Sequence, residues 1–248
     1  MQPNVKDLAV VVTGAASGVG RATTLAFASN GARVFAVDLN EEGLAETARL
    51  ADGNVTTYAA DLSDPENCAP VIEQAVAALG RLDALCNIAG VLKIEPISEV
   101  TPQSWDLIYG VNVRAPFFLT KAAMPHLIES NGAVVFISSA TAFRGYAYLS
   151  AYTSSKAAVA QLTRALAAEF IKSDVRINAI APGAINTPMS QPGQFSENID
   201  FDLLIRSMGI RPGVGPEEYT DMILYLASPD NKIVHGACIN IDDGFAAT

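Results

Sequence analysis

Tyr152 and Lys156 are the two side chains whose types and spacing point most directly to chemistry. They stand four positions apart in an alanine-rich stretch, Ala151 to Phe170, that the sequence predicts to be helical, so both lie on one helix face. Tyrosine alone is a poor base near neutrality, because its unperturbed pKa is about 10. A fixed ammonium about 4 Å away, at an effective dielectric constant near 20, favours the phenolate by about 4 kcal/mol, or roughly three pKa units. The pair therefore predicts general acid–base catalysis.

Two further polar residues are expected beside this pair. Ser139 follows the predicted strand Ala133–Ser138 and stands thirteen positions before Tyr152. Asn112 interrupts an otherwise apolar helix. Because binding sites in α/β sheets form at the carboxyl ends of the strands, we expect Asn112, Ser139, Tyr152 and Lys156 to form one catalytic group.

A glycine-rich turn near the N-terminus predicts a dinucleotide site. Residues 13–20 read TGAASGVG and connect a short apolar run to the helix that begins at Arg21. Glycines at such a turn let the backbone approach a pyrophosphate, which then sits on the helix N-terminus. The spacing is GxxxGxG rather than the GxGxxG of long-chain dehydrogenases. Three glycines also fit tight packing without a ligand, but the strand–turn–helix context favours the dinucleotide.

Asp38 predicts which dinucleotide is bound. It ends the second predicted strand, 18 positions beyond Gly20, where an acid accepts hydrogen bonds from the adenosine ribose and repels a 2′-phosphate. An NADP site needs a compensating base, and neither Ser17 nor Leu39 is basic. Asn40 is free to cap the next helix. The sequence therefore favours NAD over NADP.

The elements that position these residues alternate along the whole chain. Seven short apolar runs are separated by amphipathic, alanine-rich stretches, and continuous apolar runs predict strands buried on both faces of a parallel sheet. This predicts an α/β fold: one doubly wound Rossmann-type domain over residues 1–248, with a mostly parallel seven-stranded sheet and helices on both faces. The predicted strands are Leu8–Thr13, Arg33–Val37, Val55–Ala59, Leu82–Cys86, Ala133–Ser138, Arg176–Ala181 and Ala237–Ile241.

Helix ends and one irregular region complete this organisation. Residues 63–66, Ser-Asp-Pro-Glu, predict a capping box with Gly80 as the helix end, and Thr101-Pro102 predicts another helix start. Residues 187–216 are rich in Pro and Gly around an apolar patch at 201–205. A long irregular insertion of this kind predicts a mobile substrate-binding segment.

Taken together, these residues resemble the short-chain dehydrogenase/reductase family, in its single-domain subgroup of about 250 residues. The matching motifs run from Thr13 to Gly244. The resemblance implies that Ser139 polarises the substrate oxygen, Tyr152 exchanges its proton and Lys156 binds the nicotinamide ribose. It also implies that Lys156 lowers the pKa of Tyr152 and that Asn112 positions a water in a proton relay.

The resemblance also implies a set of cofactor contacts. The glycine-rich turn would hold the pyrophosphate, and the end of the second strand would bind the adenosine ribose. Asp61-Leu62 would flank the adenine, and the residues after the sixth strand would contact the nicotinamide. The residues are Gly14, Ser17, Gly18, Val19, Gly20, Asp38, Leu39, Asp61, Leu62, Asn87, Ala89, Gly90, Tyr152, Lys156, Pro182, Gly183, Ile185 and Thr187. Two motifs depart from the family: Asn-Asn-Ala-Gly reads NIAG at 87–90, and Asp-Gly-Gly reads DDG at 242–244. These changes concern sheet packing and the C-terminal subunit contact, not hydride or proton transfer.

Composition limits the partners. Lys and Arg total 16 against 26 Asp and Glu, a formal net charge of −10, which argues against nucleic acid and acidic lipid. Three cysteines without a CxxC spacing and two histidines predict neither a disulfide framework nor a metal site. Without a signal peptide or a membrane-length apolar stretch, we expect a soluble cytoplasmic protein.

The predicted reaction is reversible hydride transfer between NAD and a secondary alcohol or ketone. Apolar residues expected around the site favour a small hydrophobic or cyclic substrate, although Arg144, Arg206 or Arg211 could bind an acid group. The apolar residues are Ala140, Ala142, Phe143, Tyr146, Tyr148, Leu149, Met189, Phe195, Ile199, Phe201, Leu204 and Met208.

Two alternative functions and an oligomeric state are also considered. A 3-oxoacyl-(acyl-carrier-protein) reductase using NADPH is disfavoured by Asp38 and by the net charge. A non-catalytic dinucleotide-binding sensor has no need of the intact Ser139, Tyr152 and Lys156. The resemblance implies a homotetramer built through the helices around Thr101–Ile128 and Tyr152–Phe170 and the C-terminal strand. Trp105, Phe117 and Phe118 fit the core or a subunit interface better than a cofactor site.

Overall fold

A seven-stranded parallel sheet organises the chain. The computed structural model describes residues 3–51, 54–190, 196, 198–207 and 211–247. Its strands lie in the order β3-β2-β1-β4-β5-β6-β7, and each neighbouring pair is parallel. They are β1 (Ala9–Thr13), β2 (Arg33–Asp38), β3 (Val55–Ala59), β4 (Ala84–Asn87), β5 (Ala133–Ile137), β6 (Arg176–Pro182) and β7 (Cys238–Ile241). This confirms the predicted doubly wound α/β class and all seven strands, with no end shifted by more than two residues.

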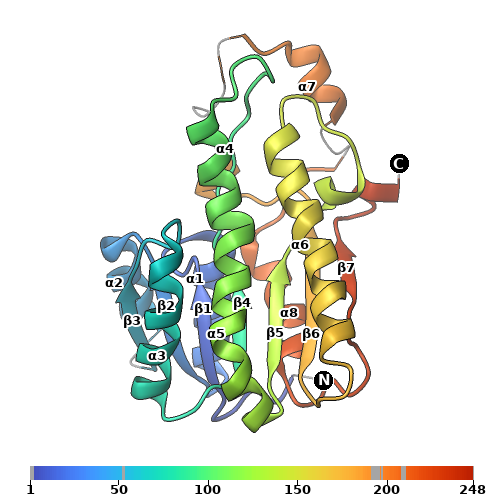
Figure 1. The fold of residues 1–248 in the computed structure, drawn as a ribbon. Coiled ribbons are helices and arrows are strands. Elements are labelled where there is room, and N and C mark those ends of the chain that lie inside the picture. Colours follow the sequence, from blue (N-terminus) through green and yellow to red (C-terminus); the bar gives the residue numbers. More distant parts are fainter. Residues whose placement is uncertain (1–2, 52–53, 191–195, 197, 208–210, 248) are drawn as a thin grey trace.

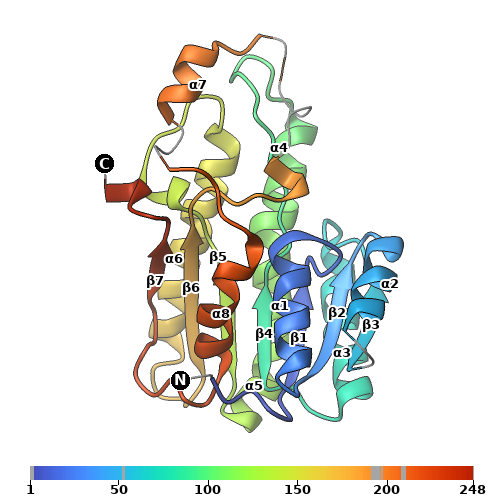
Figure 2. The ribbon, with the colours of Figure 1, turned by 180° about the vertical axis from the view of Figure 1, so that it is seen from behind.

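Helices cover both faces of the sheet. Figure 1 shows α3, α5 and α6 over one face, and Figure 2 shows α1 and α8 over the other. α7 lies beyond the carboxyl ends of the strands. The helices are α1 (Gly18–Ser29), α2 (Glu41–Leu50), α3 (Cys68–Leu79), α4 (Pro102–Tyr109), α5 (Ala115–Ser130), α6 (Ser150–Glu169), α7 (Phe201–Ser207) and α8 (Thr220–Ala227). Within the described residues, no helix is long and apolar enough to cross a membrane.

The sheet separates two apolar cores, as continuous apolar strands require. On one face Phe136 packs with Leu119 and other side chains of α3, α5 and α6. On the other, Phe27 and Ile223 from α1 and α8 pack on alternate strand residues. The expectation that every strand is buried on both faces is wrong for β3 and β7, which are partly exposed because they form the sheet edges.

Helix starts follow the predicted polar residues with one correction. Thr101 caps α4 by accepting the Ser104 N–H, and Gly80 ends α3 with φ +79°. The capping box predicted at residues 63–66 does not form. Asp64, not Ser63, accepts the Glu66 N–H at 3.0 Å, because the Asp64-Pro65 sequence begins a short 3₁₀ turn before α3.

The strand order reverses direction between β1 and β4, the place where a doubly wound sheet opens a crevice at its carboxyl edge. The glycine-rich turn follows β1 at this edge, and residues 88–90 follow β4. Thr13 ties the two together, because its hydroxyl accepts the N–H groups of Ile88 at 3.0 Å and Ala89 at 3.1 Å. The fold therefore brings the predicted cofactor and catalytic segments to one end of the sheet.

Candidate active site

The four predicted catalytic residues converge at the carboxyl ends of β4 and β5. Gly90 marks the meeting point: a Cβ placed on it would lie 3.3 Å from Asn112 Oδ1 and 3.5 Å from Lys156 Nζ. The Lys156 ammonium lies 5.8 Å from the centre of the Tyr152 ring, and Ser139 is hydrogen-bonded to Tyr152. Side chains from three separate elements therefore face one small volume.

The electrostatics of Tyr152 differ from the prediction. Burial of its hydroxyl raises the pKa of Tyr152 to about 12, and the hydrogen bond with Ser139 acts in the opposite direction. The expected lowering of this pKa by Lys156 is not found, because the groups that act on the phenol are its buried surroundings and Ser139. Near pH 7 Tyr152 thus holds its proton, the form that can donate to a ketone oxygen.

Lys156 is held firmly beneath the tyrosine. It is only 4% exposed, and its ammonium donates to the carbonyl of Ile137 at the end of β5 at 2.9 Å. Burial lowers the pKa of Lys156 to about 8. The side chain therefore still carries its charge at neutral pH, but by a narrower margin than an exposed lysine.

Asn112 lies in a π-helical turn, Gly110–Arg114, between α4 and α5, and such turns occur frequently at functional sites. Its amide accepts the Val91 N–H at 2.8 Å, donates to the Val91 carbonyl at 3.0 Å and donates to the Ser155 hydroxyl at 3.0 Å. Ser155, missed by sequence reasoning, in turn donates to the Tyr152 carbonyl at 2.6 Å. The sequence feature that could have indicated Ser155 is its position directly before Lys156.

The glycine-rich turn forms a backbone cradle that excludes side chains. Gly14 has φ +71°, and a Cβ there would lie 2.9 Å from the backbone of Ala89. A Cβ on Gly20 would lie 2.0 Å from the Gly14 carbonyl oxygen. Ser17 is the exposed N-cap of α1, with no hydrogen bond from its side chain to the helix. These residues fit a dinucleotide pyrophosphate at the start of α1.

Asp38 contacts the cradle directly. Its carboxylate accepts the Ala16 N–H at 3.0 Å and the Asn40 N–H at 2.9 Å, and Asn40 caps α2 as predicted. Leu39 is 67% exposed beside it. Because each Asp38 oxygen accepts one such bond, each keeps a lone pair for a ribose hydroxyl.

A second layer behind the cradle was not predicted. Thr47 of α2 is fully buried, and its hydroxyl donates to the Ala15 carbonyl at 2.8 Å and accepts from Arg21 Nε at 3.0 Å. Arg21 also donates to the carbonyls of Ala16 and Gly43. A buried threonine within a helix was a weak signal, since its partner lies 32 positions away.

The remaining predicted contacts fall at the same edge, with one exception. A Cβ on Gly18 would lie 3.1 Å from Thr187 Cγ2, so the loop after β6 meets the cradle. The Asn87 side chain instead points into the core and donates to Thr120 of α5 at 3.3 Å. The other contacts lie at the ends of β3, β4 and β6 or in α1: Val19, Asp61, Leu62, Ala89, Gly90, Pro182, Gly183 and Ile185.

The predicted substrate-side residues differ in exposure. Ala140, Leu149, Ile199 and Leu204 are buried, whereas Phe143, Met189 and Phe201 are at least 37% exposed. The remaining described members, Ala142, Tyr146 and Tyr148, are partly exposed. Phe195 and Met208 lie outside the described residues. Among those that are described, no three His, Cys, Asp or Glu side chains are grouped to hold a metal ion.

Comparison with known proteins gives the family. Residues 14–246 match a family model described as enoyl-(acyl carrier protein) reductase. The 3-oxoacyl-(acyl-carrier-protein) reductase of Thermotoga maritima is 36% identical over 94% of this chain and 96% of its own, and the cyclopentanol dehydrogenase of a Comamonas species is 32% identical over 98% of each. A Mycobacterium paratuberculosis short chain dehydrogenase bound to NAD is 30% identical, with a TM-score of 0.89 over 99% of this chain and 100% of its own. The chain belongs to the short-chain dehydrogenase/reductase family of oxidoreductases.

Proposed function

We propose that this protein transfers hydride reversibly between NAD and a neutral, hydrophobic secondary alcohol or ketone. The observation that carries the proposal is the convergence of Ser139, Tyr152, Lys156 and Asn112 at the sheet edge that also bears the glycine cradle. When bound, the nicotinamide supplies the hydride acceptor or donor. The protein's own residues orient the substrate and move its proton.

Tyr152 is the group that exchanges this proton. In the reductive direction its phenol donates to the ketone oxygen, and Ser139 holds that oxygen in place. Lys156 keeps a positive charge within reach of the phenolate that remains, so the stabilising field exists before the reaction starts. Asn112 and Ser155 hold the π-helical turn and the catalytic helix α6 together. We assign Asn112 the positioning of a water behind Lys156.

Asp38 supports NAD as the cofactor. Its carboxylate is fixed against the cradle by the Ala16 N–H, and a fixed negative charge there repels a 2′-phosphate. Leu39, the next residue, offers no compensating charge. The Mycobacterium paratuberculosis relative was crystallised with NAD, which agrees with this assignment.

The contacts of two arginines support a neutral substrate. Arg144 donates to the Phe245 carbonyl at 3.3 Å, and its guanidinium lies 4.9 Å from the centre of the Phe245 ring. Arg211 pairs with Asp243. The Arg206 side chain lies outside the described part of the structure. The two arginines with described contacts therefore already have partners, whereas apolar Ala140 and Leu149 flank the catalytic Ser139 and Tyr152 in the chain.

A second candidate is reduction of a 3-oxoacyl group on carrier protein with NADPH. The 36% identity to the Thermotoga maritima enzyme favours it. The net charge of −10 opposes it, because acidic carrier proteins need a basic docking surface. Asp38 opposes the NADPH part of this candidate.

The test is nicotinamide absorbance with alicyclic, aliphatic and steroidal alcohols and ketones, plus acetoacetyl-coenzyme A, each with NAD and NADP. We expect turnover with a neutral cyclic alcohol and NAD. Tyr152→Phe should lower kcat by about a thousandfold, while its NADH affinity stays within about twofold. Turnover only of acetoacetyl-coenzyme A with NADPH favours the second candidate. NADH binding with no turnover on the whole panel contradicts the proposed reaction and favours the sensor.

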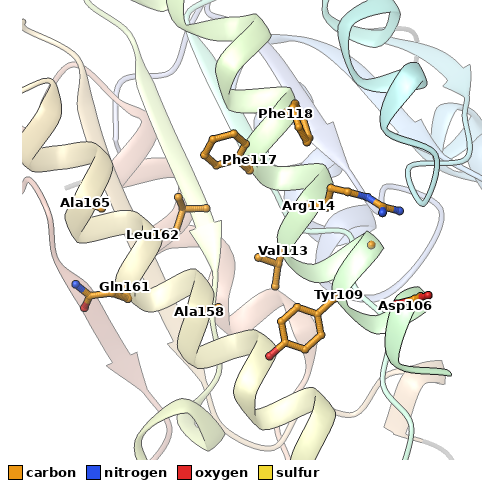
Figure 3. Close-up of a pocket in the computed structure, with 11 residues that line it drawn as sticks. Asp106, Tyr109, Val113, Arg114, Phe117, Phe118, Ala158, Gln161, Leu162 and Ala165 are labelled. Atoms are coloured by element: carbon orange, nitrogen blue, oxygen red, sulfur yellow. The ribbon is translucent and has the colours of Figure 1, made fainter. Parts of the chain in front are cut away.

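The outer face of α4, α5 and α6 supports a homotetramer. Trp105, Phe117 and Phe118 are 37–42% exposed, so they do not lie in the core, which leaves the subunit interface as our proposal for them. Figure 3 shows Tyr109, Val113 and Phe117 on the side that faces α6. The hollow they line has a volume of about 670 Å³, and most of its side chains are apolar. An exposed apolar face of this kind fits a second copy of the chain. Light scattering at micromolar concentration should give a tetramer mass, and a monomer mass contradicts it.

We keep the cytoplasm as the proposed location. Cys68, Cys86 and Cys238 are free thiols, and burial raises the pKa of each. Unpaired cysteines fit a reducing compartment. Cell fractionation with an antibody against the chain tests this assignment.

A further inference from the structure

Three segments that are distant in the sequence meet beside the substrate side of the site. They are the loop between β4 and α4, the residues just before α6, and the stretch that leads into α7. The Asn198 amide donates to Glu99 Oε1 at 2.7 Å, and the Ser196 hydroxyl donates to Glu99 Oε2. The Asp200 N–H donates to the Tyr148 hydroxyl at 3.1 Å. The side chains of Glu99 and Tyr148 thus bind three residues of the stretch that leads into α7.

Tyr148 is held in an unusual conformation for this contact. Its φ is +65°, a left-handed backbone that is strained for a bulky aromatic residue and requires surrounding contacts to persist. Its carbonyl accepts the Glu95 N–H at 2.9 Å, and the Glu95 carboxylate accepts the Ser104 hydroxyl at the start of α4. Tyr148 therefore links the β4–α4 loop to the stretch before α7, four positions before Tyr152.

Two apolar side chains of this segment are buried. Ile199 stands between Asn198 and Asp200 and is 7% exposed, and Leu204 in α7 is 5% exposed, whereas Phe201 is 56% exposed. At its base the segment closes next to the predicted nicotinamide contacts. Asn186 donates its N–H to the Val214 carbonyl at 2.8 Å and its amide to the Gly213 carbonyl at 2.7 Å.

We propose that Glu99 and Tyr148 are positioning residues for substrate binding, which set where Ile199 and Leu204 lie at the carboxyl edge of the sheet. This rests on the proposed function. Neither residue touches the reacting atoms or the cradle, so their loss weakens substrate binding and leaves the chemical step and the cofactor affinity unchanged. A hydrogen bond to a charged, partly exposed group predicts an increase in substrate KM of about three- to tenfold.

The experiment compares Glu99→Ala, Asn198→Ala, their double variant and Tyr148→Phe. The substrate is the best one from the NAD panel. Glu129→Ala, an equal charge loss on the exposed end of α5, and Tyr58→Phe, an equal hydroxyl loss on β3, are the controls. We expect a higher KM with kcat and NADH Kd unchanged in the test variants, and no change in the controls. Because Glu99 and Asn198 are direct partners, the double variant should be no worse than the poorer single variant.

Hydrogen exchange of the Asp200 amide gives a readout that does not need turnover. It should become faster in Tyr148→Phe, and exchange across residues 198–205 should become faster in Glu99→Ala. If the wild type shows no turnover but hydrogen exchange follows this pattern, the proposed reaction is wrong, whereas Glu99 and Tyr148 still hold the stretch before α7 in place. Unchanged exchange, unchanged KM, or a loss of NADH affinity equal to the loss of substrate affinity each overturns the proposal.

Discussion

The cofactor side and the substrate side of this site are built in different ways. On the cofactor side, backbone packs on backbone: Ala15 and Thr47 are fully buried, and the Gly14 and Gly20 positions have no room for a Cβ. On the substrate side, polar side chains bridge distant loops, and a Cβ on Gly145 would meet no atom within 4 Å. The cofactor geometry is therefore part of the core.

This difference explains how one scaffold accepts different substrates. Side chains that join loops can change without disturbing the sheet, whereas a change in the cradle strains the core. Relatives named as a 3-oxoacyl-(acyl-carrier-protein) reductase and a cyclopentanol dehydrogenase are 36% and 32% identical to this chain over nearly its whole length. Relatives with different activities in their names thus share one fold, as expected when function depends on the site rather than the scaffold.

A glycine-to-alanine substitution on the cofactor side and one on the substrate side should give the largest difference in NADH affinity. Gly20→Ala places a Cβ 2.0 Å from the Gly14 carbonyl oxygen, so the cradle must open, and NADH affinity should fall by about a hundredfold or more. Gly145→Ala is the matched control and should keep NADH affinity within about twofold. Fluorescence titration with NADH and thermal unfolding measure both effects. Equal losses of NADH affinity in the two variants would show that the close packing of the glycine cradle is not required for NADH binding.

Lys156→Met tests how the buried ammonium affects stability. In the folded protein burial lowers the pKa of Lys156 to about 8 from an ordinary 10.5. Between these values the unfolded chain binds the proton and the folded chain does not, so wild-type stability gains as pH rises. The difference in unfolding free energy between wild type and Lys156→Met should shift by up to about 3 kcal/mol in favour of wild type from pH 7 to pH 10.5.

Urea unfolding at several pH values measures this shift, and the comparison of two variants at each pH cancels other titrating groups. Lys172→Met, at an exposed position after α6, should show no such trend. A constant difference across the range would mean that Lys156 remains protonated in the fold.

Asp38→Asn isolates the charge that distinguishes the two cofactors. The amide keeps an acceptor for the Ala16 N–H but removes the negative charge, so the preference for NAD over NADP should narrow by about tenfold. Asp38→Ala also loses the contact with the cradle and should weaken both cofactors. Ratios of kcat/KM for NAD and NADP measure this, with Asp221→Asn, an equal charge loss at an exposed position of α8, as the control. An unchanged ratio would show that Asp38 does not set the preference.

Local patterns predicted the fold well, and they singled out four residues whose side chains converge beside Gly90. The apolar runs located all seven strands, because parallel strands are buried continuously, and the turn after β1 has the positive φ values at Gly14 and Gly18 that its glycines allow. The contacts between distant segments could not be predicted. Glu99 and Asn198 are 99 positions apart, and no local pattern encodes such a pairing. The pKa of Tyr152 was predicted in the wrong direction, because burial is a property of the whole fold.

Thr47→Val should give the smallest effect and tests whether the cradle depends on its second layer. The valine keeps the shape but removes the hydroxyl that joins the Ala15 carbonyl to Arg21. Loss of a buried hydrogen bond of this type predicts an NADH Kd about three- to fivefold higher, with substrate KM unchanged. Thr163→Val is the matched control, because that threonine is equally buried and donates to Val159 within its own helix. An effect shared by both variants would assign the loss to helix stability, and an effect confined to Thr47 would show that α2 fixes the cofactor geometry from behind.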